Sequence, residues 1–414
     1  LGNALKEQGK LEESLEAYHK ALAIKPDYPN AYYNIGVALI GVVFNQPNSF
    51  LLKTITSLLD KKLYVRPNEI SPAAISLLKF DPNLRQNLQS SSESEVQLRL
   101  MEVIKDLSAL PLLLKLMSVC PLPDVDLENL FRKLRACLLF SISELSSSTE
   151  ILKFQSALAL QCFTNEYIYN QSEHENEALR DLEVAVKQAL SNGDQPSSGS
   201  ILCLASYRPL YQYEWSKSLL ITDEIEEVFI RQILEPNQEA QFKANLPVLE
   251  EITDKVSSKV RDQYEVSPYP RWVNLRLALK PMSISKVVRE INLKLFKDQI
   301  KEIDAPNILI AGCGTGQHSI GTAARFEGSK VLAVDLSLAS LGYAKRKTEE
   351  LGIENIEYMQ ADILDLCKLG KQFDIVESSG VLHHMSDPMA GWKVLTDCLK
   401  PGGLMKIGLY SDLA

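Results

Sequence analysis

Apolar residues recur every three or four positions along much of the first two thirds of the chain. The spacing is clearest in three stretches, 97–117, 127–145 and 147–168. A period near 3.6 is that of an amphipathic α-helix, so each stretch predicts helical structure. The serine-rich segment 90–95 and the polar segment 191–200 predict loops or linkers. We therefore predict a helical region over residues 50–250.

The pattern changes near residue 300, where short runs rich in β-branched residues alternate with helical stretches. These runs are 307–311, 330–334, 355–360, 373–378 and 403–410. Strands that alternate with helices indicate βαβ units and a parallel sheet. The sequence thus predicts a multidomain protein, with an α-helical N-terminal part and a C-terminal α/β Rossmann-like domain.

Composition narrows the class of protein without fixing it. The 414 residues favour two or three domains, and 45% apolar with 23% charged residues is ordinary for a globular protein. No apolar run reaches the ~20 residues that a membrane span needs, and residues 1–20 are not a secretory signal. The net charge of −9 argues against a nucleic-acid partner.

The cysteines predict neither a disulfide framework nor a metal site. Their number is odd and no two form a CxxC pair; they stand at Cys120, Cys137, Cys162, Cys203, Cys313, Cys367 and Cys398. Scattered single cysteines are typical of a reducing compartment, so the sequence favours a cytoplasmic protein.

An internal repeat opens the chain. Leu1–Leu5 recurs as Ile35–Leu39, 34 positions later, and Tyr18 and Pro26 lie between the two copies. These residues resemble a tetratricopeptide repeat (TPR), a helix-turn-helix unit of about 34 residues. Small residues that would let its helices approach are Gly2, Ala4 and Ala21. Ser14 stands where the family usually has alanine.

We assign residues 1–45 to this TPR-like unit. The resemblance implies either a concave surface that binds a protein or peptide partner, or a helical packing module without a ligand. Stable arrays need about three repeats, so we expect further repeats before Leu1.

A glycine-rich loop follows the first predicted strand. The strand 307–311 runs into Gly312, Gly314 and Gly316, and a helix is predicted over 317–325. Glycines allow a tight turn against which a ligand can lie, and the positive end of the helix dipole favours a carboxylate. The spacing is GxGxG rather than GxGxxG, which favours an amino-acid-like cofactor over a dinucleotide.

Acidic residues end the next two predicted strands. Asp335 lies 19 residues past Gly316, where its side chain can accept hydrogen bonds from both hydroxyls of a ribose. Asp362 would lie at the edge of the same crevice, near an adenine amino group. Asp362 has a second interpretation as a simple helix cap.

Three further segments complete a pattern. The fourth strand leads into Ser378–Met385, a helix is predicted from Asp387-Pro388, and Leu399–Gly403 precedes the fifth strand. Together with the glycine loop, these segments resemble class I S-adenosylmethionine-dependent methyltransferases, close to those that methylate quinones and small molecules. The resemblance covers about residues 291–414.

The resemblance implies a set of site residues. Those that would line S-adenosylmethionine are Gly312, Gly314 and Gly316 at the methionine, Asp335 at the ribose, Asp362 and Ile363 at the adenine, and Ser378 and Ser379 near the sulfonium. His383 and His384 are candidate general bases, with a structural role as the alternative. Cys313 is interpreted as a small side chain, because nothing nearby in sequence would activate a thiolate.

A segment with two prolines and interleaved aromatics, Tyr264–Trp272, precedes the glycine loop. Prolines make such a stretch stiff and extended. We predict that residues 251–290 are a linker, in which this segment is either a lid over the cofactor or a strap that packs Tyr269 and Trp272 against the fold.

The same resemblance implies a seven-stranded sheet of order 3-2-1-4-5-7-6. The chain ends four residues after Tyr410, so we expect a methyltransferase domain truncated after the fifth strand, in a sequence that is a fragment.

The favoured function is methyl transfer from S-adenosylmethionine to an unidentified protein or small-molecule acceptor. One alternative is a non-catalytic TPR scaffold with a relict cofactor-binding domain. Another is a nucleotide-dependent oxidoreductase, which would want the GxGxxG loop that the chain lacks.

Overall fold

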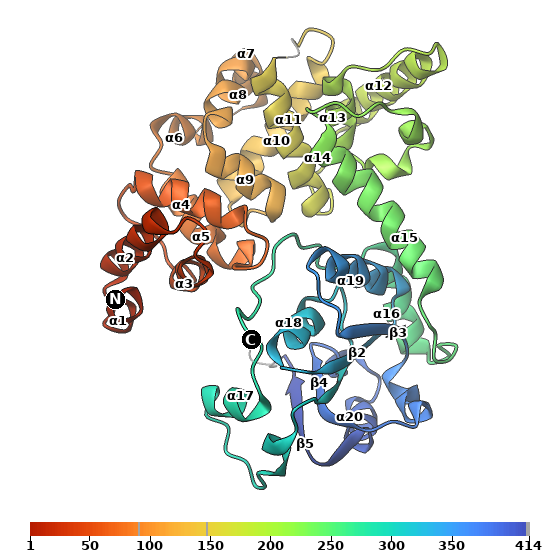
Figure 1. Cartoon of the computed structure of the whole chain (residues 1–414). Helices are drawn as coiled ribbons and strands as arrows, with labels where there is room; N and C mark the ends of the chain where they lie inside the picture. Colours follow the sequence, from red (N-terminus) through yellow and green to blue (C-terminus); the bar gives the residue numbers. More distant parts are fainter. Residues whose placement is uncertain (90–91, 146–147, 411–414) are drawn as a thin grey trace. The chain divides into compact units, whose positions relative to one another are not determined.

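The computed structural model describes residues 1–89, 92–145 and 148–410, which divide into two compact units (Figure 1). The first unit consists of Leu1–Pro236 and Trp272–Arg276, and the second of Asn237–Arg271 and Leu277–Ala414. The finer boundaries expected at residues 45, 250 and 290 stay predictions.

The first unit is helical throughout, as the apolar spacing predicts. Its α-helices are α1 (Gly2–Glu7), α2 (Leu11–Ile24), α3 (Pro29–Ala38), α4 (Ser49–Leu59), α5 (Pro67–Leu78), α6 (Pro82–Leu88), α7 (Glu93–Leu98), α8 (Leu100–Ser108), α9 (Pro111–Val119), α10 (Val125–Phe140), α11 (Thr149–Thr164), α12 (Glu173–Ser191), α13 (Ser198–Ala205) and α14 (Glu226–Phe229). Shorter helical turns are η1 (Leu210–Gln212), η2 (Glu214–Ser218) and η3 (Ile230–Leu234). Within the described ranges of the chain, no helix combines the length and the apolar character needed to cross a bilayer.

The TPR-like packing of α1 against α2 depends on small side chains. A Cβ atom built on Gly2 would come within 2.5 Å of the Tyr18 ring, so only glycine allows this approach. The Ser14 hydroxyl donates a hydrogen bond of 2.8 Å to the Gly2 carbonyl oxygen, which explains how serine replaces the usual alanine. Helix α2 ends at Ile24, before Pro26, as predicted.

Several helix boundaries differ from the prediction, and one of them lies in the predicted loop 191–200, where α13 begins at Ser198. The apolar stretch 97–117 forms two main helices, because Pro111 has no N–H to continue α8 and instead occupies the first turn of α9. The predicted loop 90–95 is wrong at its end, where α7 begins at Glu93 with the Ser92 hydroxyl accepting from the Glu95 N–H. Residues 90–91 lie outside the described residues.

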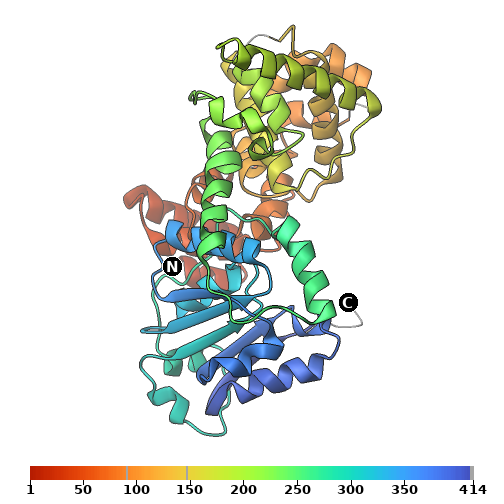
Figure 2. The ribbon, with the colours of Figure 1, turned by 90° about the vertical axis from the view of Figure 1, so that its right-hand side faces the viewer.

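The second unit contains a parallel five-stranded sheet whose strands lie side by side (Figure 2). The strands are β1 (Asn307–Ala311), β2 (Lys330–Asp335), β3 (Ile356–Gln360), β4 (Phe373–Ser379) and β5 (Leu399–Gly408), in the order β3-β2-β1-β4-β5. The helices are α15 (Glu235–Asn245), α16 (Lys255–Val266), α17 (Ile284–Glu290), α18 (Gln317–Arg325), α19 (Leu338–Glu350) and α20 (Pro388–Asp397), with the turns η4 (Gln299–Glu302), η5 (Ile363–Leu369) and η6 (Leu382–His384). The fold thus confirms the predicted α/β Rossmann-like domain.

Both faces of this sheet are covered, which explains why its inner strands are apolar almost without interruption. Ile308 and Ile310 of β1 point to the face packed by α18 and α19. Leu309 and Ala311 point to the opposite face, which is packed by η5 and α20. The boundaries of α18 agree with the predicted helix 317–325, because the glycine loop starts it and β2 follows closely.

The fifth strand begins earlier than predicted. Phe373 of β4 is paired with Leu399, and Ile375 is paired with Leu404, so Lys400–Gly403 bulge out between two paired positions. Residues 399–403, which we expected to precede the strand, are therefore part of β5. Gly408, rather than Tyr410, is the last residue of that strand.

Candidate cofactor site

The glycine loop connects β1 to α18 and is fixed to the neighbouring strand. The N–H groups of Gly312 and Cys313 both donate to the Val334 carbonyl oxygen of β2, at 2.8 and 3.0 Å. The loop then turns through Gly314 and Gly316 into the first turn of α18. It therefore lies at the carboxyl end of the sheet, where α/β proteins bind their ligands.

Gly314 is the glycine with open space beside it. Its φ of +52° is a left-handed conformation, and a Cβ atom built there would meet no atom within 4 Å. The other two glycines are closely packed, because a Cβ atom would overlap Val381 at Gly312 and come within 2.8 Å of Ala344 at Gly316. A ligand of the loop thus has room at Gly314.

Asp335 joins the end of β2 to this loop. One carboxylate oxygen accepts the Gly314 N–H at 2.7 Å, and the other accepts the Ser337 N–H at 3.0 Å. Each oxygen keeps acceptor capacity for a ligand hydroxyl. Burial raises the pKa of Asp335, and the N–H groups of Ser337 and Gly314 oppose that effect.

This raised pKa predicts how ligand binding depends on pH. Protonation removes the charge that a ribose hydroxyl would bind, so affinity for S-adenosylmethionine should fall as pH falls through the raised pKa of Asp335. The fall should begin at a higher pH than for an ordinary aspartate. Calorimetric titrations between pH 7.5 and pH 4.5 measure it, and equal pH dependence in Asp335→Asn would contradict the assignment.

Asp362 and Ile363 lie past β3, next to the end of β2. The Ala361 N–H donates to the Asp335 carbonyl oxygen at 3.1 Å, which holds the two strand ends together. The buried Asp362 carboxylate accepts the Leu364 N–H at 3.0 Å and so caps η5. The cap interpretation thus describes a contact that is present, while contact with an adenine stays a prediction.

Two polar side chains at and after the end of β4 have no hydrogen-bond partner among the described residues. Ser378 is 1% exposed, and no group within the described residues hydrogen-bonds its hydroxyl. The same holds for both ring nitrogens of His383, whose ring lies 4.4 Å from that of Tyr410. Burial first, and then the charge of His384, lowers the pKa of His383. Ser379 and His384 are exposed.

The proline-containing segment contacts the glycine loop and also the short connection between β2 and α19. We call residues 264–271 the strap. The Ser337 hydroxyl donates to the Tyr264 carbonyl oxygen at 3.1 Å, and the Thr315 hydroxyl donates to the Pro270 carbonyl oxygen at 2.8 Å. Tyr264, Glu265 and Val266 belong to α16, so the strap is extended only from Ser267 on.

Glu265 adds a third attachment. Its two carboxylate oxygens accept the N–H groups of Leu338 and Ala339, at 2.9 and 3.2 Å, in the first turn of α19. Of the two aromatics named in the strap alternative, Trp272 belongs to the first unit and is buried, whereas Tyr269 of the second unit is 63% exposed.

Sequence reasoning missed a polar cluster beside the glycine loop. His318, the second residue of α18, lies 2.8 Å from the buried Glu377 of β4 through its Nε2 atom. The Thr322 hydroxyl donates to the same carboxylate oxygen at 2.7 Å, and Lys406 of β5 lies 3.4 Å from His318 Nε2. The available signal was Glu377 itself, a charged residue that follows Ile375 and Val376 in a buried strand, although Asp374 of the same strand is charged too.

Cys313 lies inside the glycine loop but is poorly suited to react. Burial raises the pKa of its thiol well above the usual value, and the charge of Asp335 adds to the increase. We expect iodoacetamide at pH 8 to label the exposed Cys367 in the native chain and to leave Cys313 unlabelled. Mass spectrometry after digestion measures both, and equal labelling would contradict this burial.

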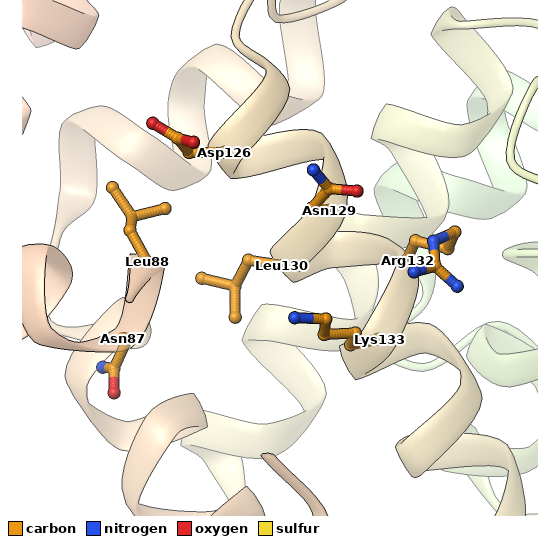
Figure 3. A pocket seen from close by; sticks show the side chains of 7 residues that line it. All are labelled: Asn87, Leu88, Asp126, Asn129, Leu130, Arg132 and Lys133. Carbon is orange, nitrogen blue, oxygen red and sulfur yellow. The ribbon is translucent and has the colours of Figure 1, made fainter. Parts of the chain in front are cut away.

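A separate hollow of about 320 Å³ lies between α6 and α10 in the first unit (Figure 3). Its lining is Asn87, Leu88, Asp126, Asn129, Leu130, Arg132 and Lys133. The buried Asn87 side chain donates to Asp106 at 3.1 Å. The hollow offers polar contacts but no glycine loop, so it is distinct from the candidate cofactor site.

A parallel sheet of this order, with a glycine loop after β1 and an aspartate at the end of β2, defines a Rossmann-like cofactor-binding domain. Residues 308–403 match the family model of a methyltransferase domain, and residues 2–40 match that of a TPR repeat. The chain therefore carries a methyltransferase domain and a TPR repeat, as the resemblances predict. The cofactor that this domain indicates is S-adenosylmethionine.

Three curated relatives resemble parts of the chain. A protein of Synechococcus sp. is 33% identical over 113 residues, 27% of this chain and 27% of its own length. The ubiquinone biosynthesis O-methyltransferases of Ruegeria pomeroyi and Coxiella burnetii are 31% and 33% identical over 139 and 132 residues. These matches cover 33% and 32% of this chain, and 54% and 53% of the two enzymes.

The chain thus spans about half the length, or less, of these relatives. Among solved structures, PKMT2 of Rickettsia typhi in complex with AdoHcy is 24% identical, with a TM-score of 0.26, over 31% of this chain and 25% of that one.

The residues present fit S-adenosylmethionine. Asp335 keeps acceptor capacity for the ribose hydroxyls, and the open side of Gly314 leaves room for the ligand. The Ser378 hydroxyl, buried without a protein partner among the described residues, supplies an unused polar contact at the end of β4.

Proposed function

We propose that the chain transfers a methyl group from S-adenosylmethionine to an acceptor. The observation that carries the proposal is the contact between Asp335 and Gly314, because it brings the ribose-binding carboxylate to the open side of the glycine loop. This contact lies inside the part of the chain that matches a methyltransferase domain.

In this proposal each predicted residue has one task. The glycine loop (Gly312, Gly314 and Gly316) holds the methionine part, Asp335 the ribose, and Asp362 with Ile363 the adenine. Ser378 and Ser379 border the sulfonium, and His383 and His384 face the acceptor. The cofactor supplies an electrophilic methyl group, so the protein must mainly align the reactants and exclude water.

The acceptor and the partner belong to the same proposal. A protein or a small molecule accepts the methyl group, and the TPR repeat at 2–40 supports a protein or peptide partner. The seven cysteines are all free thiols, which supports a cytoplasmic location.

The strap serves as a lid in this proposal. Its attachments at Thr315 and Ser337 hold it to the two loops that border the methionine and the ribose. Cofactor binding would order both loops, and the strap with them, because the same hydrogen bonds connect all three.

Removing the Glu265 carboxylate tests this lid. Glu265→Ala leaves two N–H groups of α19 without an acceptor, and we expect affinity for S-adenosylmethionine to fall about 3- to 10-fold, close to the ~1 kcal/mol value of a helix cap. Asp262→Ala, an exposed carboxylate on the same helix, is the control. Calorimetry measures both, and equal affinities in the two variants would leave the strap without a role in binding.

A label-transfer experiment tests the proposed function. The full chain is incubated with methyl-tritiated S-adenosylmethionine and a bacterial cell extract, divided into protein and small-molecule fractions. We expect S-adenosylhomocysteine to form together with label in one fraction, and both to be lost in Asp335→Ala. A chain that binds the cofactor but forms neither product would be a binding protein rather than a methyltransferase.

A further inference from the structure

Glu377 is a charged side chain in the interior of a parallel sheet. It is paired in register with Ile310 of β1 on one side and with Lys406 of β5 on the other. Only 7% of the residue is exposed. Burying a carboxylate costs free energy unless it is paired and hydrogen-bonded. The groups that contact Glu377 therefore indicate its role.

Those partners hold Glu377 in its ionised form. The His318 ring and the Thr322 hydroxyl approach the same carboxylate oxygen, at 2.8 and 2.7 Å. Burial acts to raise the pKa of Glu377, but the hydrogen bond from His318 and the charge of Lys406 lower it overall.

The pair lies at the point where the strand order reverses. The chain leaves β1 toward β2 on one side of the sheet, while β4 lies on the other side of β1. In such sheets the ligand crevice opens between the carboxyl ends of these two strands. His318 stands on the first turn after the glycine loop, and Glu377 immediately precedes Ser378.

The contacts assign the tautomer of His318. Its Nε2 atom lies 2.8 Å from a carboxylate, which can only accept, so Nε2 carries the proton. Lys406 Nζ is more distant from Nε2, at 3.4 Å. In the neutral ring the Nδ1 atom then keeps its lone pair, and no group within the described residues hydrogen-bonds it. The side chain is 25% exposed.

We propose that His318, oriented by Glu377, is the general base of the methyl transfer, and that the acceptor is a hydroxyl or amine group. His318 Nδ1 takes the acceptor proton while the acceptor lone pair forms the new bond to the methyl carbon. The methyl–sulfur bond breaks, its electrons stay on sulfur, and S-adenosylhomocysteine results. Glu377 stabilises the imidazolium that forms. This inference rests on the proposed function and assigns the proton to His318 rather than to His383 or His384.

The first test uses the full chain without cofactor. Nitrogen NMR of chain labelled with ¹⁵N-histidine reports which ring nitrogen carries the proton, and His318→Ala identifies the signal. We expect the Nε2–H tautomer at neutral pH, and a mixture of tautomers in Glu377→Gln. An Nδ1–H tautomer in the unaltered chain would overturn the proposal.

The second test separates this inference from the proposed function. Calorimetry with S-adenosylhomocysteine should give the same affinity, within about threefold, for the unaltered chain and for His318→Ala. An unaltered chain that does not bind would contradict the proposed function itself. If only His318→Ala loses binding of S-adenosylhomocysteine, the transfer assays use His318→Gln instead. Loss of binding in His318→Gln as well would show that His318 binds the cofactor, and would overturn the proposal.

The third test measures transfer from methyl-labelled cofactor to three probes: 3,4-dihydroxybenzoate, benzylamine, and dimethyl sulfide, which has no proton to lose. We expect label on a hydroxyl or amine probe. In His318→Ala the rate of transfer should fall about 100- to 10,000-fold, and it should recover at least tenfold on addition of imidazole. Glu377→Gln should lower kcat with little change in KM. His174→Ala, a histidine with an 88% exposed side chain, is the control and should have no effect.

Each contrary result counts against the proposal. Transfer only to dimethyl sulfide, or to no probe by a chain that binds the cofactor, would overturn the acceptor class. Activity of His318→Ala within threefold of the unaltered chain, or a loss that imidazole does not restore, would overturn the role of His318.

Discussion

Replacement of Gly314 by valine is expected to abolish binding of S-adenosylmethionine, with a loss of ~1,000-fold or more in affinity. The side chain would occupy the open space beside the loop, at a φ of +52° that L-residues rarely adopt. It would also stand next to the N–H that donates to Asp335. Calorimetry on the folded variant measures the loss.

Gly370 provides a matched control for this substitution. Its φ of +58° is nearly the same, and a Cβ atom there would also meet nothing within 4 Å. Gly370→Val should therefore show the same backbone strain, about 1–2 kcal/mol, while binding the cofactor normally. If both valine variants bind alike, the space beside Gly314 is not where the cofactor lies.

Removal of the Asp335 carboxylate is expected to weaken cofactor binding by about 1.5–3 kcal/mol, roughly 10- to 150-fold. Asp335→Ala loses the acceptor for the ribose hydroxyls and also frees the N–H groups of Gly314 and Ser337. The fold should persist, because the residue ends a strand rather than filling the core. Calorimetry and circular dichroism together separate these effects.

Asp387→Ala is the control for the backbone contacts. The Asp387 carboxylate also accepts two backbone N–H groups, those of Met389 and Ala390, at the start of α20. Asp387→Ala should lower the free energy of unfolding by about as much as Asp335→Ala does, and it should leave the cofactor affinity unchanged. Equal weakening in Asp335→Ala and Asp387→Ala would remove Asp335 from the ribose site.

The parts of this domain that the sequence predicts are those with local determinants. The glycine loop and α18 follow from residues within one short segment, and the buried strand β1 follows from an apolar run. Asp335 is predictable because β2 must end beside that loop. The apolar period alone does not show where α9 starts, because Pro111 interrupts the helix without interrupting the apolar spacing.

The missed features depend on contacts between distant residues. His318 and Glu377 are brought together by the pairing of β1 with β4, which no local pattern reveals. The early start of β5 depends on a bulge opposite β4. The strap could be recognised as stiff, but its hydrogen bonds to Thr315 and Ser337 could not be foreseen.

Calorimetric titration of the full chain with S-adenosylmethionine, and separately with NAD, measures which cofactor the second unit binds. We expect saturable binding of one S-adenosylmethionine per chain, competition by S-adenosylhomocysteine, and no heat with NAD. Binding of NAD in place of S-adenosylmethionine would indicate an oxidoreductase and contradict the account. A folded chain that binds neither would contradict it equally, and would leave a scaffold with a relict domain.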